Sequence, residues 1–120
     1  MKIFLICPVR NVTPEETKAI QAYVADLEVK GHQVYWPARD TNQDDPIGLR
    51  ICKDNRMAIL QADGVHVWWN PASTGSMFDL GMAFMAHKWV VLVNGVEPTV
   101  GKSFNNFLLK LQEIEEVEKA

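Results

Sequence analysis

The sequence predicts an α/β protein: a doubly wound parallel sheet of four to five strands with helices on both faces. Two observations indicate this fold class. Four short apolar runs alternate along the chain with four longer segments in which apolar residues recur at helical spacing. Such alternation favours right-handed β-α-β crossovers, which place the strands side by side in one parallel sheet. The chain has 120 residues, 48% of them hydrophobic, so we expect one domain over residues 1–120 with a modest core.

The first part of the chain is expected to form a strand, a helix and a second strand. The run from Lys2 to Cys7 is almost entirely apolar, as expected for a strand buried on both faces. Thr13 can cap a helix and Pro14 suits its first position, so a helix begins here. A short strand at 33–36 follows, and residues 38–46 are expected to be a long irregular loop of the kind that often carries function.

The rest of the chain continues the alternation. A second helix is expected at 47–62, because its apolar residues share one face. Residues 64–69 and 89–93 are apolar and rich in β-branched residues, which is typical of strands. Between them we expect a third helix from Ser76 to about His87, and Ser103 is expected to cap the last helix.

The third helix is apolar on nearly its whole circumference. Its large apolar residues fall on two sides, with Met77, Leu80 and Phe84 on one and Phe78, Met82 and Met85 on another. A helix with two apolar faces packs on the sheet and on something else. We therefore expect a homodimer.

Charge and composition exclude several classes of protein. The net charge of −3 argues against nucleic-acid binding, and no segment has the roughly 18 apolar residues of a membrane span. Two cysteines and three scattered histidines match neither a disulfide framework nor a metal site. P-loop and dinucleotide fingerprints are absent. We expect a cytoplasmic protein without metal or cofactor.

The stretch from Asn70 to Gly81 is the strongest candidate site. It joins an apolar strand to a helix through small and hydroxyl residues, and free backbone N–H groups at such a helix start bind anions. Ser73, Gly75 and Ser76 would form this seat. The alternative is that Ser76 merely caps the helix with Asp79 as its reciprocal partner.

Two residues outside this stretch are also candidates. Arg10 follows the first strand, where its guanidinium can bind a ligand phosphate, although a solvated loop arginine fits equally well. Trp36 ends the second strand and can stack on a nucleobase, although tryptophans more often fill the core.

Three segments together resemble the nucleoside 2-deoxyribosyltransferase superfamily. They are the first strand ending in Pro8-Val9-Arg10, the segment Leu60-Gln-Ala-Asp63, and Gly75-Ser76-Met77-Phe78-Asp79-Leu80-Gly81-Met82-Ala83. The likeness covers nearly the whole chain, because the order and length of the elements also agree. It implies a flavodoxin-like three-layer fold and an enzyme that cleaves the N-glycosidic bond of nucleosides or nucleotides.

The resemblance assigns catalytic roles with two departures. The nucleophilic Glu of the family falls on Asp79, which is one methylene shorter. The Asp that assists the leaving base falls on Asn55, with Asp54 beside it. The shorter Asp79 lowers the expected rate, because a displacement of about 1 Å can cost a hundredfold. Loss of the leaving-group acid at Asn55 lowers it by a further ~10²–10⁴-fold unless another group replaces that acid.

The resemblance also assigns phosphate contacts. Transferases that accept free nucleosides carry an Asp where this chain has Ser73, whereas the branch that hydrolyses nucleoside 5′-monophosphates has a phosphate-binding Ser there. That branch also has an Arg after the first strand and a Ser at the last helix, contributed across a homodimer, which match Arg10 and Ser103. The first-strand Tyr of that branch falls on Phe4, so its hydroxyl is missing.

The leading hypothesis is therefore an N-glycosidase-type hydrolase acting on a (deoxy)nucleoside 5′-monophosphate. A non-catalytic nucleotide-binding module on the same fold is the main alternative, because Asp79 and Asn55 depart from the family pattern. A nucleoside deoxyribosyltransferase is a further alternative, and a flavodoxin-like electron carrier is conceivable on fold alone.

Overall fold

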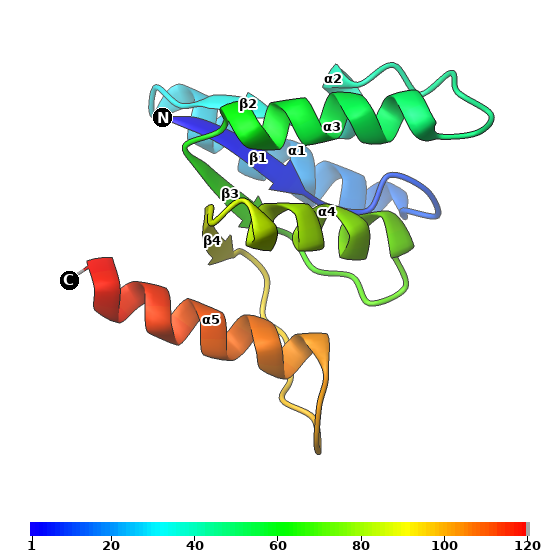
Figure 1. Cartoon of the computed structure of the whole chain (residues 1–120). Coiled ribbons are helices and arrows are strands. Elements are labelled where there is room, and N and C mark those ends of the chain that lie inside the picture. Colours follow the sequence, from blue (N-terminus) through cyan, green and yellow to red (C-terminus); the bar gives the residue numbers. More distant parts are fainter. Residues whose placement is uncertain (120) are drawn as a thin grey trace.

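The computed structural model describes residues 1–119, with the side chains of residues 1–115 (Figure 1). Strands and helices alternate as the sequence predicted. In chain order the elements are β1 (Lys2–Ile6), α1 (Pro14–Val29), β2 (Gln33–Tyr35), α2 (Pro37–Asp40), α3 (Leu49–Gln61), β3 (Gly64–Val67), α4 (Thr74–Met85), β4 (Trp89–Leu92) and α5 (Phe104–Lys119).

The four strands form one parallel sheet in the order β2-β1-β3-β4. The chain therefore runs from β1 outward to β2, and then crosses back to place β3 on the other side of β1. This reversal is the switch point at which open α/β sheets bind ligands, beyond the carboxyl ends of the strands. The loops that follow the four strands all lie at that end of the sheet (Figure 1).

The core has one layer on each face of the sheet, because successive β1 side chains point to opposite faces. Helix α1 covers one face, and α3 and α4 cover the other (Figure 1). The α1 layer contains Ile3, Leu5, Ile20, Val24, Leu27, Val34 and Trp36. The α3–α4 layer contains Phe4, Ile6, Ile59, Val65, Val67, Leu80, Ala83, Val90 and Leu108. The prediction of a first strand buried on both faces is confirmed.

Helix α5 packs along β4, the last strand of the sheet (Figure 1). The Gln112 side-chain oxygen accepts a hydrogen bond from the Leu92 N–H (2.6 Å), and the Glu115 carboxylate accepts one from the Val90 N–H (2.6 Å). These are the N–H groups through which a further strand would pair, so side chains end the sheet at four strands.

Several boundaries differ from the sequence prediction, and three of these differences bear on the site. The segment expected to be irregular at 38–46 begins instead within the one-turn helix α2, which Pro37 starts. Helix α3 begins at Leu49 rather than Ile47, because Gly48 adopts φ +87° immediately before it. The prediction that Ser76 caps α4 was wrong, since Ser73 is the cap and its Oγ accepts the Ser76 N–H at 3.2 Å.

Within the described residues, no helix is both long and apolar enough to cross a bilayer. The described side chains also contain no group of three or more His, Cys, Asp or Glu arranged to hold a metal ion.

Candidate active site

Asp79 is a buried carboxyl in the second turn of α4. Its residue is only 9% exposed, and it projects from the helix that begins at the carboxyl end of β3. Burial raises the pKa of Asp79 from the ordinary 3.8 to about 7, and a hydrogen bond from the Asn55 side chain opposes this rise. A carboxyl in this state ionises near neutral pH, so it can serve as a nucleophile or a proton carrier there.

A series of hydrogen bonds leads from Tyr35 of β2 toward Asp79. The Tyr35 hydroxyl lies 2.7 Å from Thr41 Oγ1, and Thr41 Oγ1 donates to Asn55 Oδ1 at 2.8 Å. Asn55 lies next to the Asp79 carboxyl, close enough for its side chain to lower the pKa of that group. Thr41 and Asn55 are both buried, at 4% and 6% exposure, so this series of hydrogen bonds lies in the interior.

The start of α4 forms the predicted seat of small and hydroxyl residues. Ser73 Oγ lies 2.8 Å from Ser76 Oγ, and Ser76 is buried whereas Ser73 is half-buried. Gly75 is exposed, and a Cβ there would meet nothing within 4 Å. Because Ser73, Ser76 and Asp79 are spaced three apart, their side chains follow one side of the helix from its first turn to the carboxyl.

Cys7 of the α1 layer lies within electrostatic reach of Asp79, and Trp36 of the same layer lies next to Cys7. The Asp79 charge and burial both act on the Cys7 thiol, and burial is the main reason its pKa rises to about 12. Trp36 is 8% exposed, and its Nε1 has no hydrogen-bond partner of normal geometry among the described residues, although it lies close enough to Cys7 to oppose that pKa rise. Trp36 fills the core, as the alternative interpretation of its sequence position held.

Among the described side chains, no hydrogen bond or ion pair joins the other predicted residues to Asp79. Asp54 lies on the exposed side of α3, where it pairs with Arg50 at 3.1 Å, whereas the adjacent Asn55 points inward. Arg10 is exposed in the loop after β1 and takes part in no ion pair among the described side chains. Ser103 caps α5, accepting the Asn106 N–H at 3.0 Å and the Thr99 hydroxyl at 2.6 Å.

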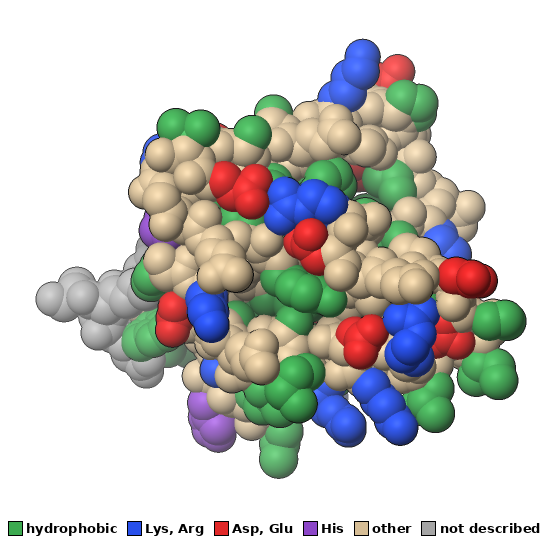
Figure 2. Space-filling model, turned by 90° about the horizontal axis from the view of Figure 1, so that it is seen from above, with side chains coloured by type: hydrophobic (Ala, Val, Ile, Leu, Met, Phe, Trp, Pro, Cys, Tyr) green, Lys and Arg blue, Asp and Glu red, His purple; other side chains and the backbone are tan. Residues whose placement is uncertain are grey.

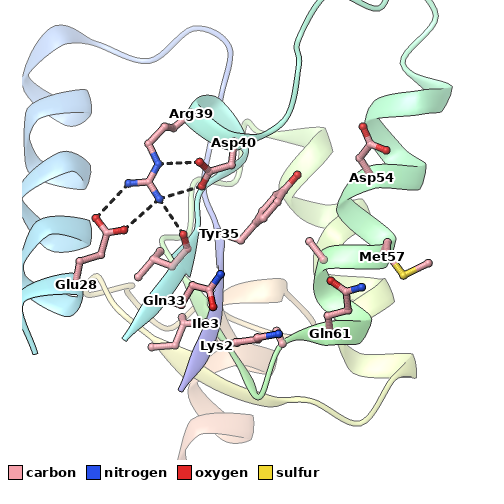
Figure 3. Close-up of a pocket in the computed structure, with 13 residues that line it drawn as sticks. Lys2, Ile3, Glu28, Gln33, Tyr35, Arg39, Asp40, Asp54, Met57 and Gln61 are labelled. Carbon is pink, nitrogen blue, oxygen red and sulfur yellow. Dashed lines mark hydrogen bonds and ion pairs between the residues drawn. The ribbon is translucent and has the colours of Figure 1, made fainter. Parts of the chain in front are cut away.

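Two cavities lie outside the Asp79 site. The β2-edge cavity, about 600 Å³, is lined by residues of β2, α2 and α3, including Gln33, Tyr35, Arg39, Asp54, Met57 and Gln61 (Figure 3). Arg39 spans its rim, bonded to Glu28 at 3.2 Å and to Asp40 at 2.9 Å. The α3–α4 groove, about 670 Å³, is lined by Ile59, Leu60, Met77, Phe78, Met82 and Met85, among others.

The surface above α2 and α3 carries both signs of charge. In the space-filling view from this side, acidic and basic side chains are interspersed rather than gathered into one block (Figure 2). The face shown therefore carries no block of positive charge of the kind that binds a nucleic acid.

Sequence reasoning missed Tyr35, Thr41 and Cys7 as neighbours of the site. Each is neutral, and each reaches Asp79 or Asn55 only through the crossing of β1, β2 and α3 in space. One signal was present, because Thr41 lies in the polar loop that was singled out as long enough to be functional.

Comparisons with known proteins identify the fold. No protein-family model and no curated protein sequence matches the chain. Among solved structures, a 2-deoxyribosyltransferase from Bacillus psychrosaccharolyticus, a biocatalyst for nucleoside synthesis, is similar with a TM-score of 0.69 and 20% identity. That match covers 92% of this chain and 96% of the other.

A second similar structure is the CMP N-glycosidase BcmB of Clostridium botulinum, with a TM-score of 0.59 and 25% identity. The match covers 77% of this chain and 67% of that one. Both proteins belong to the nucleoside 2-deoxyribosyltransferase superfamily. The two structures confirm the predicted flavodoxin-like α/β fold, and with it the resemblance to that superfamily that the sequence indicated.

Proposed function

We propose that this protein hydrolyses the N-glycosidic bond of a (deoxy)nucleoside 5′-monophosphate, with Asp79 as the nucleophile. The observation that carries the proposal is the placement of Asp79. Its carboxyl is buried, lies next to Asn55, and is located one turn beyond the Ser73–Ser76 pair at the start of α4. The similarity to enzymes that act on nucleosides or on CMP supports the same chemistry.

In this mechanism the ionised Asp79 oxygen bonds to C1′ of the sugar as the bond from C1′ to the base nitrogen breaks. The base leaves with the bonding electron pair and takes up a proton. Water then attacks C1′ of the glycosyl ester, releasing the sugar phosphate and regenerating the carboxylate. Asn55 has no acidic proton, so the proton for the base has to come from solvent or another group.

The phosphate would bind at the first turn of α4. The N–H groups of a first helical turn have no partner within the helix, and the helix dipole favours an anion there. Ser73 and Ser76 add hydroxyls at this point, and Arg10 supplies a guanidinium with no ion-pair partner among the described side chains. Gly75 leaves open space for the ligand on the exposed side.

A non-catalytic nucleotide-binding module is the second candidate. Two observations favour it: Asp79 is partly protonated at neutral pH, and its leaving-group partner is an amide rather than an acid. Such a protein would bind the nucleotide at the same place and release nothing. A deoxyribosyltransferase is a third candidate, in which a second base rather than water attacks the glycosyl ester.

The test is incubation of the pure protein with a panel of nucleoside and deoxynucleoside monophosphates, with free base measured by chromatography. The proposal predicts base release that Asp79→Ala abolishes and that a second added base does not divert into a new nucleoside. Calorimetry on the same panel separates the candidates, because tight binding without release identifies the binding module. Neither release nor binding at high protein concentration would contradict both.

We also propose that the protein is a homodimer joined through the α3–α4 groove. Large apolar side chains stand on its rim, with Phe78 56% and Met85 81% exposed. Exposed apolar surface of this extent, gathered over two adjacent helices, marks an interface. A second copy is the economical occupant because the same groove on both chains gives a self-complementary contact. Two free cysteines, Cys7 and Cys52, suit the reducing conditions of the cytoplasm, where we place the protein.

The dimer would complete the phosphate site with Ser103 of a second copy. Sedimentation should show a dimer that Phe78→Glu dissociates, whereas Glu113→Gln on the exposed side of α5 does not. Mixing Asp79→Ala and Ser103→Ala chains should then restore base release to about a quarter of the wild-type level, since half the dimers are mixed and hold one intact site. No recovery on mixing would show that each chain builds its site alone.

A further inference from the structure

We propose that Tyr35 and Thr41 are positioning residues, which fix the Asn55 side-chain amide so that its N–H, and not its oxygen, faces Asp79. This inference rests on the proposed role of Asp79 and adds two residues that neither the family resemblance nor the sequence pattern assigned. It starts from the direction of each bond in the buried series of hydrogen bonds.

The directions follow from the number of protons available. Thr41 has one hydroxyl proton and donates it to Asn55 Oδ1 at 2.8 Å. Thr41 Oγ1 can therefore only accept in its 2.7 Å bond with Tyr35, so the Tyr35 hydroxyl is the donor. Because Asn55 Oδ1 is directed toward Thr41, the NH₂ group is the branch of the amide that we assign to Asp79.

This direction decides which form of Asp79 is favoured. An amide N–H stabilises the ionised carboxylate, whereas an amide oxygen would stabilise the protonated acid. The Asn55 side chain could present either its N–H or its oxygen to Asp79, because a half rotation of the amide exchanges the two groups. Thr41 removes that choice, and Tyr35 in turn fixes the rotation of the Thr41 hydroxyl.

The surroundings hold Tyr35 in place. Its ring stacks on Phe4 of β1, with ring centroids 5.6 Å apart and an interplanar angle of 12°. Figure 3 shows the Tyr35 ring standing between β2 and α3, at the wall of the β2-edge cavity. In the family that this chain resembles, the first strand carries a Tyr at the position of Phe4. Here the phenol belongs instead to Tyr35 of the neighbouring strand β2, which stacks on Phe4 and whose hydroxyl bonds Thr41.

Among the groups that face Asp79, Asn55 is the one whose orientation can change the pKa of Asp79. From β1 the facing titratable group is the Cys7 thiol, whose pKa of about 12 keeps it neutral at the pH values of the test. From α3 the facing polar group is the Asn55 amide, which lowers the pKa of Asp79, whereas burial raises it. Glu16 acts on Cys7 rather than on Asp79.

The experiment compares Thr41→Val with Thr41→Ser in the full chain. Thr41→Val keeps the shape of the side chain but removes the hydroxyl proton that bonds Asn55 Oδ1. Thr41→Ser keeps that hydroxyl proton. Carbon-13 NMR of labelled aspartate, with the Asp79 signal assigned by its loss in Asp79→Asn, follows the carboxyl titration directly. We expect Thr41→Val to raise its midpoint by about one pH unit and Thr41→Ser to leave it near the wild-type value. Tyr35→Phe should raise it by less.

This readout needs no enzymatic activity, so its result is independent of the proposed hydrolysis. If base release is observed, the acidic limb of its pH profile should move with the midpoint: Thr41→Val should be about tenfold slower than wild type below that midpoint and close to it well above. A merely structural defect would lower the rate equally at every pH. An unchanged Asp79 midpoint in both Thr41→Val and Tyr35→Phe would overturn the inference, and Tyr35→Phe decides the matter should Thr41→Val fail to fold.

Discussion

Replacing Asp79 by Asn should make the protein more stable above neutral pH and leave it nearly unchanged in acid. Asp79 is 9% exposed and its pKa rises from 3.8 to about 7 in the folded chain. Ionising it in the fold therefore costs about 4 kcal/mol more than ionising it in the unfolded chain. Asn has nearly the same shape, and its oxygen can still accept the bond from Asn55.

The sign follows from which state holds the proton. Below about pH 4 both folded and unfolded chains are protonated at this carboxyl, so it adds no pH dependence. Between about pH 4 and 7 only the folded chain keeps the proton, so the free energy of unfolding of the wild type falls as pH rises. Above about pH 7 both states are ionised and the loss is complete. The advantage of Asp79→Asn should grow over this window and then stay constant.

Urea unfolding at fixed protein concentration, measured from about pH 4 to pH 8 for both proteins, gives this difference directly. We expect it to increase by as much as about 4 kcal/mol across the range. Glu113→Gln removes one carboxylate from an exposed position, 67% accessible, and controls for the change in net charge. A difference that stays flat with pH, or that matches the Glu113→Gln control, would show that Asp79 ionises as freely as a surface carboxylate and would refute the reasoning.

Three further outcomes follow from described contacts. Ser73→Ala removes the side chain that caps α4 through the Ser76 N–H, so it should lower the free energy of unfolding by about 1 kcal/mol in the same urea assay and also weaken nucleotide binding. Arg10→Ala should weaken binding of a nucleoside monophosphate about tenfold or more in calorimetry while leaving binding of the free nucleoside unchanged, and Arg10→Lys should recover only part of it. Gln112→Leu leaves the Leu92 N–H at the sheet edge without its acceptor, so the protein should lose about 1–3 kcal/mol of stability and aggregate sooner on heating, measured by light scattering.

Local sequence signals were sufficient for the order of the elements. The run from Lys2 to Cys7 is apolar at every position but its first, and it is buried on both faces because helices cover both sides of the sheet. Capping at Thr13 was likewise predicted, and its Oγ1 accepts the Glu16 N–H at 3.0 Å. These signals lie within a few residues of the feature that they predict, so no knowledge of the rest of the fold is needed.

The start of α4 shows why a boundary was misplaced. Both Ser73 and Ser76 are good capping residues, and the sequence does not say which one adopts the extended backbone of a cap. In the structure Ser73 does so, at φ −90° and ψ 101°, and Ser76 is thereby drawn into the first turn and buried. The same shift places Asp79 beyond the first turn, facing the interior.

The candidate site was predictable only in part. Asp79 and Asn55 were found because they occupy the positions of the nucleophile and the leaving-group acid in the family that the chain resembles, and the structure brings them together. Tyr35 and Thr41 were not found, because a hydroxyl that matters through one hydrogen bond leaves no periodic or spacing signal. Their contribution depends on which strand lies next to β1, and that is a property of the sheet order.

Asn94 has a consequence for how the site can open. Its side-chain oxygen accepts the Trp69 N–H at 2.6 Å, and its nitrogen donates to the Trp69 carbonyl at 2.8 Å. The side chain thus acts as one more peptide group and extends the β3–β4 ladder past the last backbone pair. Trp69 also bonds Asn105 at the start of α5, at 3.2 Å. The loop that leads into α4 and the loop that leads into α5 are therefore both attached to Trp69. A movement that admits a ligand has to carry both loops together or first break the hydrogen bonds between Asn94 and Trp69.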